Sequence, residues 1–124
     1  MKEQLKNRIL GNRFSLDLRC KGIINHDEFH ALSQALQELS VEWQKETCID
    51  KDVMEDIFFD FISISGELWS VENTPLAKEK RNIVLTLDRL IRQCLSTPRS
   101  PEQAMAAYNQ RLKLWGEEFI PEAD

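Results

Sequence analysis

The stretch from residue 25 to residue 43, NHDEFHALSQALQELSVEW, decides the fold class. Its large apolar residues step by three and four positions, a spacing that places them on one face of an α-helix. Asn25 is a good N-cap residue, and Glu28 three positions later predicts a capping box, so the helix begins here. The apolar row is a heptad pattern and predicts packing along another helix. Its members are Phe29, Leu32, Leu36, Leu39 and Trp43.

Four further helices are expected from the same periodicity. They cover residues 2–20, a segment from Asp50 to about Trp69, a segment from Pro75 to Leu95, and a segment from Pro101 to about Gly116. The last carries an apolar row made by Met105, Tyr108, Leu112 and Trp115. Alternation at residues 14–18 and the run FFDFISIS at 58–65 also suit strands. Helix is preferred at 14–18 because no second strand is evident to pair with it.

Short connections between these segments make successive helices antiparallel neighbours. The 124 residues are therefore expected to form a single all-α domain, an antiparallel helical bundle of about five helices. Four of them form an up-down bundle, and the fifth packs on it. Residues 117–124 are expected to form an acidic C-terminal tail.

Composition excludes several classes of protein. Only 4 Gly and 4 Pro argue against a turn-rich β-sandwich or barrel. No apolar run is long enough for a membrane span, and the first residues lack the apolar core of a signal peptide. The 3 cysteines are an odd number without a CxxC pair, which favours a reducing, cytoplasmic setting.

Catalytic and cofactor motifs are absent from the sequence, so we expect a protein that is not an enzyme and has no cofactor. His26 and His30 share one side of a helix, but a catalytic zinc site requires a third protein ligand. The cysteines occur singly on apolar faces and are expected to be buried, unreactive thiols. No glycine-rich phosphate loop is present.

Charge is distributed very unevenly along the chain. The net charge is −5, but residues 22–72 contain 12 acidic and only 2 basic residues. Residues 1–21 contain 6 basic and 2 acidic residues, a net charge of +4. The sign of the acidic stretch argues against a duplex DNA or RNA partner for this part of the chain, because phosphate would be repelled.

Carboxylates form two rows with the spacing of one helical turn. The first row is Glu38, Glu42 and Glu46, and the second is Asp52, Asp56 and Asp60. Like charges at this spacing oppose helix formation, by about 1–2 kcal/mol for the four pairs. Two explanations are open: the repulsion is tolerated because salt screens it, or the carboxylates are kept for binding. The two helices are sequential, and we expect the rows to form one anionic docking surface for a cationic protein, with Trp43, Phe59 and Trp69 as apolar anchors. The candidate binding residues are Glu38, Glu42, Glu46, Asp52, Glu55, Asp56, Phe59 and Asp60.

A small acidic helical chain with no active site resembles the colicin D-type and contact-dependent-inhibition immunity proteins of bacteria. The resemblance covers roughly residues 23–72, from INHDEFHALSQALQELSVEWQ through the acidic segment that follows. It implies a cytoplasmic inhibitor that occludes the basic active site of a cationic toxin, with a nuclease as the expected kind of toxin. No single residue is assigned a role by the resemblance.

Two alternatives remain open at this point. A structural adaptor or secretion chaperone would use surplus apolar surface to form a homodimer. A nucleic-acid-binding regulator would use the basic residues of the helix at 75–95, chiefly Lys78, Lys80 and Arg81.

Overall fold

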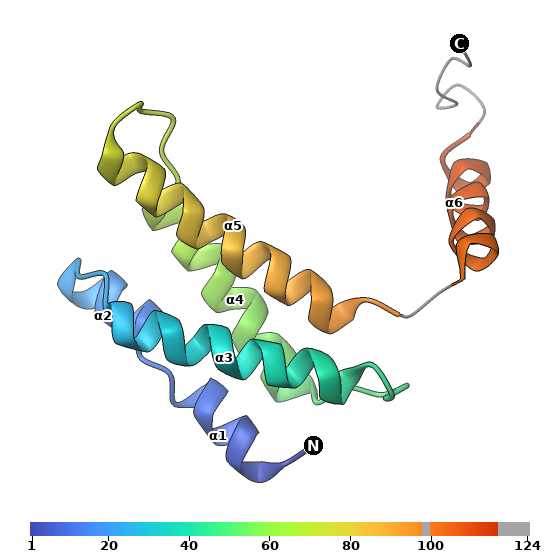
Figure 1. The fold of residues 1–124 in the computed structure, drawn as a ribbon, viewed down its shortest axis with the longest axis horizontal. Coiled ribbons are helices and arrows are strands. Elements are labelled where there is room, and N and C mark those ends of the chain that lie inside the picture. The colour runs from blue at the N-terminus through green and yellow to red at the C-terminus, as the bar shows by residue number, and fades with distance from the viewer. Residues whose placement is uncertain (98–99, 117–124) are drawn as a thin grey trace.

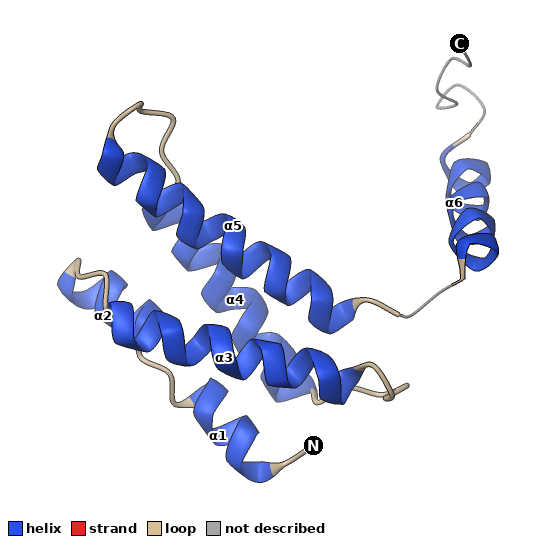
Figure 2. Ribbon diagram, viewed as in Figure 1, coloured by secondary structure: helices blue, strands red, loops and turns tan. Residues whose placement is uncertain are grey.

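The computed structural model describes residues 1–97 and 100–116, and within them every regular element is an α-helix (Figure 2). The all-α fold class is thereby confirmed. The described helices are α1 (Glu3–Leu10), α2 (Phe14–Lys21), α3 (His26–Trp43), α4 (Lys51–Leu68), α5 (Pro75–Leu95) and α6 (Pro101–Trp115).

Five of these helices surround one core. The long helix α3 packs against α5 on one side and against α1 on the other, and α4 packs against α5, α2 and α1 (Figure 1). The chain turns back between α4 and α5, so these two helices run antiparallel. The largest fully buried side chains come from α1 to α5: Ile9, Phe14, Leu36, Leu39, Val53, Ile64, Leu87 and Leu90.

The segment expected to form one helix over residues 2–20 forms two, α1 and α2, because the helix is interrupted at residues 11–13. Gly11 forms the C-cap of α1, where a Cβ atom would stand 2.9 Å from the Asn7 carbonyl oxygen. The Asn12 side chain donates hydrogen bonds to the backbone oxygen and to Oε2 of Glu28, each at 2.9 Å. A continuous helix over 2–20 was thus a wrong prediction, since contacts to a distant segment end α1.

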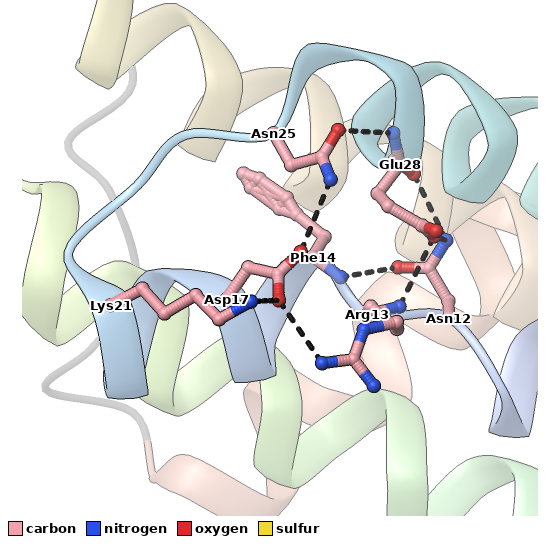
Figure 3. A network of polar contacts seen from close by, with 7 residues as sticks. All are labelled: Asn12, Arg13, Phe14, Asp17, Lys21, Asn25 and Glu28. Carbon is pink, nitrogen blue, oxygen red and sulfur yellow. Dashed lines mark hydrogen bonds and ion pairs between the residues drawn. The ribbon is translucent and has the colours of Figure 1, made fainter.

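A polar network holds this break against the start of α3 (Figure 3). The Asn25 side chain accepts from the Glu28 N–H at 3.2 Å and donates to Asp17 Oδ2 at 3.1 Å. The Glu28 carboxylate accepts from Asn12 and from the Arg13 N–H. Only the N-cap half of the predicted capping box at Asn25 is therefore present, because the Glu28 side chain bonds to the α1–α2 turn instead.

The remaining predicted helix starts agree with the structure. Asp50, Thr74 and Ser100 each accept a hydrogen bond from the backbone N–H three residues later. The strand-like run at 58–65 is helical throughout, and α4 continues past Gly66 to Leu68.

The helix at 101–115 does not pack on the bundle as expected. Among the described residues, α6 has no Cα atom within contact distance of another helix, and Figure 1 shows it apart from α1–α5. None of its described side chains is buried. The predicted tail at 117–124 lies outside the described residues.

Candidate functional site

Two carboxylates of α3 from the predicted docking surface, Glu38 and Glu42, are paired within the chain. Glu38 forms an ion pair with Arg8 of α1. Glu42 Oε1 accepts from the Lys2 backbone N–H at 2.9 Å and lies 3.8 Å from the Met1 amino group. Glu46 is exposed. The basic N-terminal segment therefore neutralises most of the row that the sequence assigned to docking.

Lys6 of α1 forms a second link, this time to the start of α4. Its Nζ lies 3.0 Å from Asp50 Oδ2 and 3.8 Å from Asp52 Oδ2. The helix α1 contacts both α3 and α4, so its cations lie between the two rows. One continuous anionic surface, as expected from the sequence, is therefore not formed.

The carboxylates of α4 line a depression of their own. Its volume is about 330 Å³, and we call it the α4 depression. The lining combines three carboxylates with two apolar side chains, one of them from the end of α1. These residues are Leu10, Asp52, Glu55, Asp56 and Phe59. Four of the eight predicted binding residues thus meet at one place.

Charge within the α4 depression is only partly compensated. Asp52 is 78% exposed and has the long contact to Lys6. Among the described residues, Glu55 and Asp56 form no ion pair with the chain's own cations. The depression is therefore a local concentration of negative charge that is available to another molecule.

Burial acts strongly on Asp56. It raises the pKa of this carboxyl to about 6, and the neighbouring charge of Asp60 adds to the shift. Burial also raises the pKa of Asp60, against the opposing effects of Arg19 and Ser15 on α2. Asp60 does not line the depression; with Asp56 it borders a separate small pocket that is lined by side chains of α3, α4 and α5.

Phe59, one of the three predicted apolar anchors, lies on the surface of α4. Its side chain is 62% exposed, and its ring meets the ring of Phe58 edge-on at a centroid distance of 5.7 Å. Trp69 is also exposed, at the end of α4. Trp43 is only 4% exposed and belongs to the core, so it was wrongly predicted as an anchor.

The histidines and cysteines form no catalytic arrangement in the described part of the chain. His26 Nε2 lies 2.7 Å from Glu79 Oε1, which links the starts of α3 and α5. Residues 1–97 and 100–116 contain no group of three His, Cys, Asp or Glu side chains suited to a metal ion. Cys94 is buried, but Cys20 and Cys48 are exposed, so the expectation of three buried thiols was wrong for two.

The basic residues of α5 named above, Lys78, Lys80 and Arg81, differ in exposure and in contacts. Arg81 donates to the backbone oxygens of Ser70 and Glu72 at 2.5 and 2.7 Å, and thereby clamps the α4–α5 loop. Lys78 is exposed, whereas Lys80 is half-buried. A phosphate-binding patch on this helix has little support in this arrangement.

Sequence reasoning missed two contributors to the site, Leu10 and Lys6. Both belong to the segment that was expected to be a continuous helix. The net charge of +4 in residues 1–21 beside the acidic stretch was the available indication that this segment neutralises carboxylates.

Comparison with known proteins gives no relative: no family model matches the chain, and neither curated protein sequences nor solved structures give a match. Among the described residues, no helix combines the length and apolar character that crossing a lipid bilayer requires.

Proposed function

We propose that this chain is a non-enzymatic protein-binding inhibitor that docks a cationic protein through the α4 depression. The observation that carries the proposal is the meeting of Asp52, Glu55 and Asp56 with exposed Leu10 and Phe59. Lysine and arginine side chains combine an apolar stem with a charged end, so this lining suits them. The Phe59 ring offers a face for a cation–π contact.

The state of Asp56 supports a binding role. Its raised pKa means that the folded chain holds an ionised carboxylate at neutral pH at a cost in free energy. An arriving guanidinium or ammonium group would remove part of that cost. Perturbed groups of this kind gather at functional sites.

The class of partner, a cationic toxin, is inferred from the resemblance to bacterial immunity proteins. A cationic nuclease toxin in the bacterial cytoplasm would be inhibited by occlusion, because the carboxylates pair with the lysines and arginines that otherwise hold substrate phosphates. The surface is narrower than the sequence suggested, since Glu38 and Glu42 are already paired within the chain.

Site-specific photo-crosslinking in the native host tests this proposal. A photoreactive phenylalanine analogue replaces Phe59 in the full chain, and the control places it at Val71, which is 91% exposed in the α4–α5 loop. We expect position 59 to capture a protein of net positive charge that position 71 does not capture. Equal capture at both positions, or capture of an acidic protein at 59, would overturn the proposal.

A further inference from the structure

The helix α6 presents an apolar face that the chain leaves uncovered. Met105 is 59% exposed and Tyr108 40% exposed, and Leu112 follows one turn later on the same side. No other described helix contacts α6. Exposure of such a face to water is unfavourable, so a second apolar surface is needed to stabilise this helix.

A matching surface lies on the outer side of α4. Phe58, Ile62 and Trp69 follow each other at steps of four and seven residues, which places them on one side of a helix. They are 50%, 52% and 51% exposed, respectively. We call these three residues the α4 stripe. The buried residues Val53, Ile57, Ile64 and Leu68 lie on the opposite side of the same helix.

We propose that a second copy of this chain covers the α4 stripe with its α6, and that the exchange is reciprocal. Each copy then contributes one uncovered helix and one uncovered stripe. The resulting two-fold interface buries two copies of the α6 apolar face and two copies of the α4 stripe.

Charge fixes the orientation of the exchanged helix. The first ten residues of α4 contain Lys51 and the four carboxylates Asp52, Glu55, Asp56 and Asp60, whereas Glu67 is the one charged residue among its last eight. The first half of α6 contains Glu102, and its second half contains Arg111 and Lys113. An antiparallel arrangement places the α6 cations opposite the acidic half of α4. It also opposes the two helix dipoles.

The chain's own α6 cannot adopt that orientation. Since α5 runs antiparallel to α4, α5 ends near the start of α4 (Figure 1). Five residues, 96–100, link α5 to α6. Six extended steps from residue 95 to residue 101 reach about 20 Å, whereas the 18 residues of α4 span about 27 Å. In its own chain α6 would have to lie parallel to α4, with Arg111 and Lys113 directed away from the acidic half.

This dimer is argued from other apolar residues than the proposed inhibitor function, but the α6 cations of the second copy would face the carboxylates of the α4 depression and would compete with a cationic partner for them. The α4 stripe adjoins the α4 depression but shares no lining residue with it. The two proposals fail in different ways: a chain that is monomeric and is captured at position 59 removes the dimer alone, whereas a chain that is dimeric and is not captured there removes the docking proposal alone.

The molar mass of the full chain in solution is the first test. Light scattering is expected to give twice the 14.5 kDa mass of one chain. Ile62→Glu and Met105→Glu should each raise the dissociation constant at least tenfold. The matched control is Leu85→Glu on α5, where the native side chain is 53% exposed, and it should leave the dimer intact. A monomeric wild-type chain, or dissociation by the control alone, would overturn the proposal.

Cysteine crosslinking tests which segments meet. In a background with Cys20 and Cys48 changed to serine, an Ile62→Cys chain is mixed with a Tyr108→Cys chain under mild oxidation. The exchange predicts a disulfide between the two different chains. Two results would contradict it: crosslinking of the Tyr108→Cys chain to itself, which indicates paired α6 helices, and an intramolecular disulfide in the double variant, which indicates that α6 covers its own α4.

The orientation is tested by charge. Arg111→Glu with Lys113→Glu should weaken the dimer several-fold at low salt, whereas Arg89→Glu with Lys78→Glu on α5 should not. Equal effects of the two pairs would show that net charge, and not the antiparallel arrangement, determines the affinity.

Discussion

The ammonium group of Lys6 lies 3.0 Å from Asp50 Oδ2, and this ion pair fastens α1 to the start of α4. The hydrogen bond with Asp50 raises the pKa of Lys6, and the bond with Lys6 lowers the pKa of Asp50. The same aspartate caps α4. The pair explains why the two acidic rows do not merge, since a cation lies between them.

Loss of this pair should destabilise the fold in a pH-dependent way. Because the folded pKa of Asp50 lies below its unfolded value, the pair contributes stability above the unfolded pKa and loses it as the pH falls through the folded pKa. We expect Lys6→Met to lower Tm at neutral pH, and the difference from wild type to vanish in acid. Thermal unfolding between neutral pH and about pH 2 measures this. Lys78→Met is the control, and an equal, pH-independent loss in both variants would refute the assignment.

Asp56 should show the opposite pH dependence. Its folded pKa is raised to about 6, so the ionised folded form is penalised above that pH and the penalty disappears as the pH falls toward the unfolded value. We expect Asp56→Asn to stabilise the chain by about 1 kcal/mol at pH 7, after allowance for solvent screening. The gain should shrink between about pH 6 and pH 4. Urea unfolding of both chains at about pH 7 and about pH 4 measures the gain. A gain that is equal at the two pH values would contradict the burial of this carboxyl.

The Asn25 side chain should contribute measurably to the junction of α2 and α3. It caps α3 and donates to Asp17, so Asn25→Ala is expected to cost about 1–2 kcal/mol in the free energy of unfolding. Asn109→Ala, at an exposed position on α6, is the matched control and should be close to neutral. Similar losses in both variants would show that the network in Figure 3 adds no stability.

The three thiols should differ in reactivity. Burial raises the pKa of Cys94 to about 11, and its Sγ donates to the Leu36 carbonyl oxygen at 3.2 Å, whereas Cys20 and Cys48 are exposed. We expect a thiol reagent at pH 8 to label two cysteines rapidly and the third only after denaturation. Rapid labelling of all three would mean that the core around Leu36 opens under native conditions.

Local sequence features predicted the fold where the determining contacts are themselves local. The caps at Asp50, Thr74 and Ser100, and the apolar periodicity of α3 and α5, act within a few residues. The break between α1 and α2 depends on Asn12 meeting Glu28, which is 16 residues away. Such a contact leaves no mark in the spacing of apolar residues.

The same distinction explains the partial success at the site. Helical spacing placed Asp52, Glu55, Asp56 and Phe59 close together, because all four belong to one helix. Whether α3 adds carboxylates to that group depends on what lies between the helices. Arg8 and the N-terminal amino group lie there and pair with the α3 carboxylates, and tertiary packing alone determines their position.

The association rate with the cationic protein captured at position 59 tests the central claim most directly. Stopped-flow mixing at low and high salt compares Glu55→Lys with Asp56→Lys against Glu46→Lys with Glu72→Lys, which makes the same change in net charge outside the α4 depression. We predict that the first pair slows association at low salt at least about tenfold more than the second and flattens its salt dependence. Equal rates for the two doubly substituted chains would contradict the account.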